Sequence, residues 1–127
     1  MNLKELTQQF LKEEGFCPQE TEFGLAFKCE GKNYLLIYDD DDQQYFRLMM
    51  PCIFETTEEN RDLVLHAMNE VNSSVKVIKA YIMCENEVWL GFEVLVDSTP
   101  VVGDFIPRAI SMLNGGARKF FQTLQEG

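Results

Sequence analysis

The strongest constraint on the fold is a pair of strand-like runs in the second half of the chain. Residues 75–83 and 88–96 are rich in β-branched and aromatic residues, and a short turn at Glu85-Asn86 separates them. Two such runs bounded by a tight turn are typical of a β-hairpin. Strands joined by a short turn must be antiparallel, so the sequence predicts an antiparallel sheet here.

The first half of the chain predicts three more strands. Residues 23–29 alternate between apolar and small or polar side chains, which indicates a strand. Gly31 follows, and glycine can take the positive φ that a hairpin turn needs. Residues 34–38 and 45–50 are predicted as the next two strands. The sheet is therefore expected to have five strands.

Three segments have the 3.6-residue apolar period of amphipathic helices. The first is predicted to start at Asn2, with Glu5 at capping-box spacing, and to end at Gly15. The second is predicted to start at Thr56, with Glu59 at the same spacing. Residues 72–74 should end it, because Asn and Ser favour turns.

The third helix is predicted to start in residues 97–100, where Ser or Thr before Pro is a typical helix entry, and to run nearly to the end of the chain. Pro107 predicts a bend or a later start, because proline lacks the N–H group and clashes with the preceding turn. The pair Gly115-Gly116 predicts either a break or a close packing contact. Gly91 similarly predicts a bulge or a close packing point in its strand.

The order is therefore α-β-β-β-α-β-β-α, which predicts an α+β fold with a five-stranded, mostly antiparallel sheet and helices packed on it. With 127 residues, the chain is expected to form a single domain, residues 1–127.

The charge of the chain excludes some classes of partner. The formal net charge is −10, from 21 acidic and 11 basic residues, and no segment is rich in Lys or Arg. Such a chain repels nucleic acids and anionic membranes, so neither is expected as a partner. No run approaches the ~20 apolar residues of a membrane-spanning helix, and the first residues lack the pattern of a secretory signal. A cytoplasmic location is expected.

The four cysteines do not have the spacing of zinc ligands, and His66 is the single histidine. We expect reduced, mostly buried thiols, because a free cysteine behaves as a small hydrophobic residue. The common hydrolase, nucleotide-binding and metalloprotease motifs are absent. We therefore expect no enzyme activity, no catalytic residue and no cofactor.

One stretch contains four consecutive carboxylates, Asp39, Asp40, Asp41 and Asp42. A calcium-binding EF-hand loop starting at Asp39 would need Gly at position 44 and Glu at position 50, where this sequence has Gln44 and Met50. Apolar runs flank the stretch on both sides, which predicts a hydrated hairpin loop with no metal. A weak divalent-cation site is the alternative that the residues leave open.

The strands carry apolar residues on both faces, which is unusual for an antiparallel sheet with one solvated face. Leu35 and Ile37 point away from Leu36, and Trp89 and Leu95 point away from Leu90. Three helices do not obviously cover both faces of five strands. The uncovered face is therefore expected to bind a second copy, a ligand or a polypeptide, through Leu35, Ile37, Trp89 and Leu95. The alternative is that the helices cover this face as well.

The element order, the length, the acidic charge and the long last helix resemble the type III secretion chaperone-like fold, particularly its YbjN-type branch. Residues 23–27, Phe-Gly-Leu-Ala-Phe, and residues 89–93, Trp-Leu-Gly-Phe-Glu, are strands of the kind that this family contains. The resemblance extends from Leu3 to Leu124. It implies a small cytoplasmic protein, commonly a homodimer, that binds an unfolded segment of a polypeptide client.

Together these observations predict a non-enzymatic, homodimeric protein-binding module that is chaperone-like or regulatory. The alternative is a protein that binds a small molecule, or an enzyme, with a pocket between the sheet and the last helix.

Overall fold

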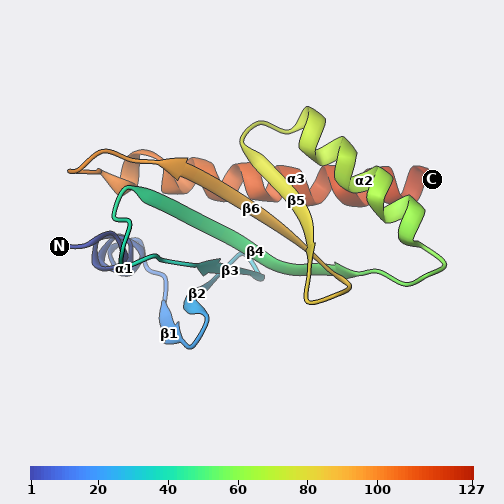
Figure 1. Cartoon of the computed structure of the whole chain (residues 1–127). Helices are drawn as coiled ribbons and strands as arrows, with labels where there is room; N and C mark the ends of the chain where they lie inside the picture. The colour runs from blue at the N-terminus through green and yellow to red at the C-terminus, as the bar shows by residue number, and fades with distance from the viewer.

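The computed structural model describes residues 1–127 and has the predicted α+β architecture (Figure 1). Its helices are α1 (Leu3–Glu13), α2 (Arg61–Ser74) and α3 (Ile106–Glu126), with a short 3₁₀ helix, η1 (Val102–Asp104), before α3. The strands are β1 (Gln19–Thr21), β2 (Gly24–Cys29), β3 (Lys32–Leu36), β4 (Tyr45–Glu55), β5 (Ile78–Met83) and β6 (Glu87–Leu95). They form one sheet in the order β1-β2-β3-β4-β6-β5.

All neighbouring strands are antiparallel, as predicted, but the sheet has six strands and the prediction of five was wrong. The additional strand is β1, a three-residue segment whose side chains are all exposed. It pairs with β2 through Gln19 opposite Ala26 and Thr21 opposite Gly24. Glu20 also forms a salt bridge with Lys4 of α1. A strand with no buried side chain leaves no apolar alternation in the sequence.

The predicted ends of α1 are confirmed. The side chain of Asn2 accepts a hydrogen bond from the backbone N–H of Glu5 at 2.8 Å. Gly15 has a φ of +90°, and the N–H of Phe16 donates to the carbonyl of Leu11 at 2.9 Å. These contacts satisfy backbone groups at both helix ends that have no partner inside the helix.

The predicted start of α2 was wrong, because the helix begins at Arg61 and not at Thr56. Thr56 is buried, and its N–H donates to the carbonyl of Asn86 at 2.7 Å, which holds it at the end of β4. The reciprocal hydrogen bonds form one residue later. The N–H of Thr57 donates to Oδ1 of Asn60, and the N–H of Asn60 donates to Oγ1 of Thr57. Residues 72–74 belong to the helix, which ends after Ser74.

Of the two alternatives predicted at Pro107, the later start is confirmed: α3 begins at Ile106, after η1, and Pro107 occupies its first turn, where a missing N–H is tolerated. The helix continues through Gly115 and Gly116 to Glu126. None of the three helices combines the length and the apolar character that spanning a bilayer requires.

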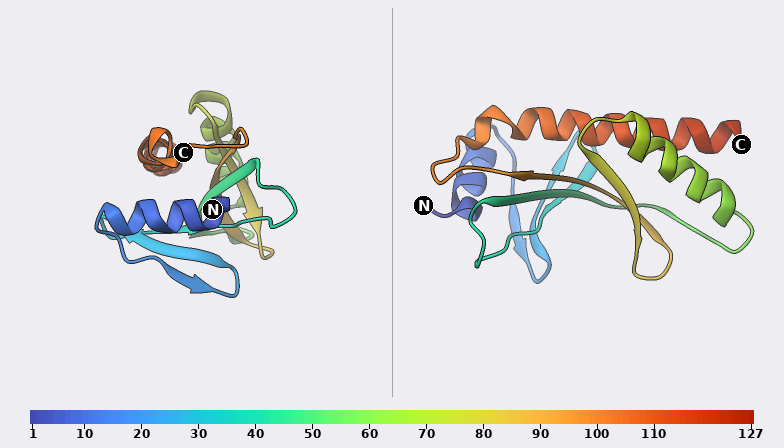
Figure 2. Two further views of the ribbon diagram at one scale, coloured as in Figure 1. Left: turned by 90° about the vertical axis from the view of Figure 1, so that its left-hand side faces the viewer. Right: turned by 45° about the horizontal axis from the view of Figure 1, so that its top comes forward.

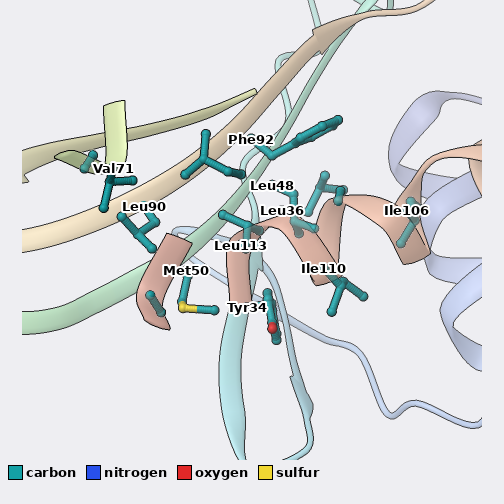
Figure 3. Close-up of a cluster of buried hydrophobic side chains, with 14 of the residues drawn as sticks. Tyr34, Leu36, Leu48, Met50, Val71, Leu90, Phe92, Ile106, Ile110 and Leu113 are labelled. Carbon is teal, nitrogen blue, oxygen red and sulfur yellow. The ribbon is translucent and has the colours of Figure 1, made fainter. Parts of the chain in front are cut away.

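The core lies between the helices and one face of the sheet. Buried residues of α1, α2 and α3 form a single cluster with every second residue of the strands. Figure 2 shows α3 running along β4 and β6 on the same side as α2. Figure 3 shows Leu113 of α3 among Leu36, Leu48 and Leu90 of the sheet. The opposite face of the sheet carries no helix.

Gly116 allows α3 to approach the sheet closely. A Cβ atom at this position would lie 3.1 Å from Cγ2 of Ile78 and 3.3 Å from Cδ1 of Leu90. A Cβ atom at Gly115 would meet no heavy atom within 4 Å. Of the two predicted alternatives, the close packing contact is confirmed, at Gly116.

All four cysteines are free, but the prediction that they are mostly buried was wrong. Cys17, Cys52 and Cys84 are exposed, and Cys29 is half-buried. Cys52 lies at the irregularity of β4, and Cys84 lies in the turn between β5 and β6. Both have a positive φ, of 30° and 53°. Partial burial raises the pKa of the Cys29 thiol above its ordinary value, and partial desolvation together with the carboxylates of Glu87 and Glu55 raises the pKa of the Cys52 thiol. His66 is exposed on α2.

Candidate functional site

The candidate site is the helix-free face of the sheet, which we call the open face. The strand register places Ala26, Leu35, Met49, Gly91 and Lys79 in one row across this face. Residues two positions away along each strand share the face, because side chains alternate along a strand.

The four residues predicted at a binding or dimer surface all lie on the open face. Leu35 is 7% exposed, and Ile37 and Trp89 are half-buried. Leu95, at the end of β6, is 78% exposed. The N–H of Ile37 donates to the carbonyl of Arg47 at 3.1 Å, which keeps the chain aligned with β4 beyond the end of β3. The surface thus runs along β6 from Trp89 to Leu95, roughly 20 Å for a strand segment of this length.

Met49 is fully buried at the centre of the open face, although no helix covers it. A Cβ atom on Gly91 would lie 3.0 Å from both Sδ and Cε of Met49, so the thioether lies across the glycine. The hydroxyl of Tyr81 lies 3.6 Å from Sδ of Met49 and donates to it. Gly91 is therefore a close packing point, which is one of its two predicted alternatives. The irregularity in strand pairing occurs in β4, between Met50 and Phe54.

A polar network lies beside Met49 and separates the apolar parts of the open face. Glu93 accepts hydrogen bonds from the hydroxyl of Tyr45 and from Nζ of Lys79, each at 2.9 Å. Nη2 of Arg47 donates to the hydroxyl of Tyr81 at 2.9 Å, and its Nε lies 3.5 Å from Oε1 of Glu93. The hydrogen bond from Lys79 is the main cause that holds the pKa of Glu93 below its ordinary value.

This network corrects the expectation of an apolar face. Arg47 and Glu93 are directly opposite each other on β4 and β6, and Lys79 lies on β5 next to them. In the sequence, the polar Arg47 stands beside the apolar Leu48, and the polar Glu93 stands beside the apolar Phe92. This alternation is the normal pattern of a sheet with one solvated face. The apolar surface of the open face is therefore divided between the Leu95 end and the Leu35 end.

A groove of about 650 Å³ lies at the Leu35 end, where β1, β2 and β3 meet Pro51 of β4. Its floor is formed by open-face residues of neighbouring strands, and Phe16 and Cys17 come from the segment that follows α1. Lys28 is its charged lining residue. The floor and polar edge are formed by Gln19, Ala26, Asn33, Leu35 and Pro51. Sequence reasoning identified Leu35 but missed the other residues, because β1 was not predicted.

The groove extends to the edge of the core at Tyr34. The hydroxyl of this buried residue donates to Oδ1 of Asn114 on α3 at 2.7 Å. Burial raises the pKa of Tyr34 to about 12, so the hydroxyl stays protonated at neutral pH. The ring stacks on Phe27, with centroids 5.3 Å apart. The groove thus has an apolar wall at Phe27 and Tyr34 and a polar edge.

The acidic stretch, residues 39–42, forms the tip of the β3–β4 connection, as predicted. Carboxylate oxygens of Asp39 and Asp42 accept the N–H groups of Asp41 and Gln44, at 2.9 and 3.1 Å. The next residue, Gln43, accepts the N–H of Leu3 with its Oε1 at 2.9 Å. The acidic loop therefore lies at the N-terminus of α1, where negative charge is favourable for the helix dipole.

Comparison with solved structures found similar folds over nearly the whole chain. YbjN from E. coli, a proposed transcription regulator, superposes with a TM-score of 0.67 and 12% identity, covering 90% of this chain and 87% of that chain. An uncharacterized protein from Methanothermobacter thermautotrophicus gives 0.66 and 12%, covering 97% and 96%. A chain of the heterodimeric ExoU–SpcU complex from the type III secretion system of Pseudomonas aeruginosa gives 0.57 and 13%, covering 98% and 99%.

No protein-family model matches the sequence, and a search of the curated proteins found no match. At 12–13% identity the structural likeness concerns the fold alone. At the level of the fold, these structures confirm the resemblance to the YbjN-type, type III secretion chaperone-like fold.

Proposed function

We propose that this protein is a non-enzymatic, chaperone-like module that binds an extended segment of a polypeptide client in the groove on the open face. The observation that carries the proposal is the groove itself, with its apolar floor at Ala26 and Leu35 and its amide edge at Gln19 and Asn33. Amide side chains can hydrogen bond to the backbone of an extended peptide, and the floor can accept apolar side chains.

The fold supports this proposal. One of the similar structures is a chain of a heterodimeric protein complex, so the same architecture serves protein association elsewhere. We further propose that the chain acts as one domain and as a homodimer in the cytoplasm. Leu95 would lie in the dimer interface, because it is the most exposed large hydrophobic residue of the strands.

The single tryptophan gives a direct test, because Trp89 lies on the open face with its Nε1–H donating to Glu87 at 2.9 Å. The probe is reduced, carboxymethylated ribonuclease A, an unfolded polypeptide without tryptophan. We expect it to change the Trp89 emission in a saturable way.

The Ala26→Gln variant should weaken this binding about tenfold, because a long polar side chain would fill the groove. Ser111→Gln, at an exposed position of α3, is the matched control and should bind like the unmodified protein. An unchanged affinity in Ala26→Gln would refute the groove as the binding site.

A second candidate function, binding of a small molecule, is favoured by the volume of the groove, since small-molecule sites typically have ~300–1,000 Å³. Native mass spectrometry of the purified protein distinguishes the two. A stoichiometric small molecule that Ala26→Gln removes would replace the polypeptide proposal.

A further inference from the structure

A second cleft lies on the helix side of the molecule, away from the open face. It has a volume of about 350 Å³, and its lining residues come from the segment that joins α2 to β5, from β6, from η1 and from the start of α3. We call it the Val77 cleft. Its apolar wall consists of Val77, Phe92, Phe105, Ala109 and Met112.

Val77 has an unusual backbone conformation. Its φ is +58°, in the left-handed region that a β-branched residue rarely adopts. The residue is 61% exposed, so burial in the core does not explain why a valine occupies this position. Asn or Gly would fit the backbone with less strain. Strain of this kind at an exposed residue is typical of positions whose side chain serves binding.

The charges around the cleft differ from those of the whole chain. Lys76 and Arg108 line it and are exposed, and neither forms a salt bridge. Asp104 is the acidic lining residue, so two positive charges and one negative charge give the cleft +1, while the chain carries −10. An apolar hollow with two unpaired cations is complementary to a ligand that combines an apolar group with carboxylates.

We propose that the Val77 cleft binds a short acidic segment of a polypeptide, with one apolar side chain in the hollow and carboxylates paired with Lys76 and Arg108. The choice of a polypeptide as ligand rests on the proposed function, but the site is separate from the groove. Arg and Lys can each donate several charge-assisted hydrogen bonds to a carboxylate, so acidic residues beside the apolar side chain give specificity.

Titration of the ¹⁵N-labelled protein, followed by NMR, tests this proposal with three probes. The first is a hexapeptide with a central Leu-Phe pair flanked by acidic residues. The second has lysine in place of each acidic residue, and the third is octanoate. We expect the acidic peptide to shift the amide resonances of Val77, Phe105 and Arg108, and the basic peptide and octanoate to leave them unchanged.

Matched variants separate the role of Val77 in binding from its role in stability. Val77→Asn should raise the melting temperature by about 4 °C, because Asn tolerates a positive φ, and should weaken binding of the acidic peptide about tenfold. Val101→Asn is the control, since Val101 is 63% exposed but has an ordinary φ of −105°. It should change neither quantity. The double variant Lys76→Glu, Arg108→Glu should abolish binding.

Several outcomes would overturn the inference. Equal binding of the basic peptide would exclude a role for the two cations, and equal shifts with octanoate would assign the cleft to a small amphiphilic acid. If Val77→Asn binds as tightly as the unmodified protein, the valine has no binding role. If the acidic peptide shifts only the resonances of Ala26, Leu35 and Trp89, the proposed function holds and the Val77 cleft is not a polypeptide site.

Discussion

Substitutions of the two adjacent glycines of α3, Gly115 and Gly116, test how closely this helix approaches the sheet. Replacing a glycine inside a helix by alanine gains about 1 kcal/mol of helix propensity. At Gly115 the new Cβ atom meets no heavy atom within 4 Å, so Gly115→Ala should gain this whole amount. At Gly116 the Cβ atom would lie 3.1 Å from Ile78 and 3.3 Å from Leu90, and this crowding should cancel the gain.

A larger residue amplifies the difference. Gly116→Leu forces a branched side chain between α3 and the sheet, and overpacking of this kind costs about 1–3 kcal/mol. Gly115→Leu is the matched control, because it has the same helix propensity and open space around it. For a chain of this length, each kcal/mol changes the melting temperature by about 4 °C.

The measurement is the free energy of unfolding from urea titrations followed by circular dichroism, with thermal melting as a second readout. Gly115→Ala should be more stable than the unmodified protein, and Gly116→Leu less stable than Gly115→Leu. Equal stabilities of the two leucine variants would show that α3 does not lie against Ile78 and Leu90 at Gly116.

Two further predictions concern association through the sheet. The side chain of Asn72 on α2 accepts a hydrogen bond from the N–H of Ala80 at 2.6 Å and donates one to the carbonyl of Ala80 at 3.1 Å. These two hydrogen bonds occupy backbone groups at the outer edge of β5. Asn72→Ala should therefore lower the free energy of unfolding by about 1–3 kcal/mol and cause concentration-dependent association in light scattering, whereas the exposed Asn69→Ala should do neither. Leu95→Asp should convert the proposed homodimer to a monomer at micromolar concentration, and Leu65→Asp on α2 is its control. A dimer that persists in Leu95→Asp would place the interface elsewhere.

The sequence predicted those parts of the fold that depend on local patterns. The strand patterns in residues 23–29 and 88–96, the cap at Asn2 and the positive φ at Gly31 depend on neighbouring residues, and the structure has the two strands, the cap and the positive φ. The predicted start of α2 failed because Thr56 is held by Asn86, 30 positions later in the chain. A capping signal in the sequence cannot reveal that a tertiary hydrogen bond holds Thr56 at the end of β4.

The candidate site was predictable only where it depends on the local pattern of a strand. Alternation placed Leu35, Ile37, Trp89 and Leu95 on a common face, because side-chain direction follows from the period of a strand. The groove was not predictable, since it depends on β1, and β1 is held by its pairing with β2 and by the salt bridge from Glu20 to Lys4. The exposure of Cys52 and Cys84 was missed because Cys52 lies at an irregularity of β4 and Cys84 lies in the turn between β5 and β6. Both residues have a positive φ, which a sequence pattern does not reveal.

The polar network on the open face determines what kind of partner this surface can bind. A flat partner that covered the whole face would have to remove Glu93, Arg47 and Lys79 from water, and burying charges costs several kcal/mol unless new partners replace the solvent. A narrow segment in the groove avoids this cost, because Lys28 is the charged group that it meets. A second copy that contacts only the Leu95 end avoids it as well. The two proposed uses of the face therefore occupy opposite ends, and client binding should not require the dimer to dissociate.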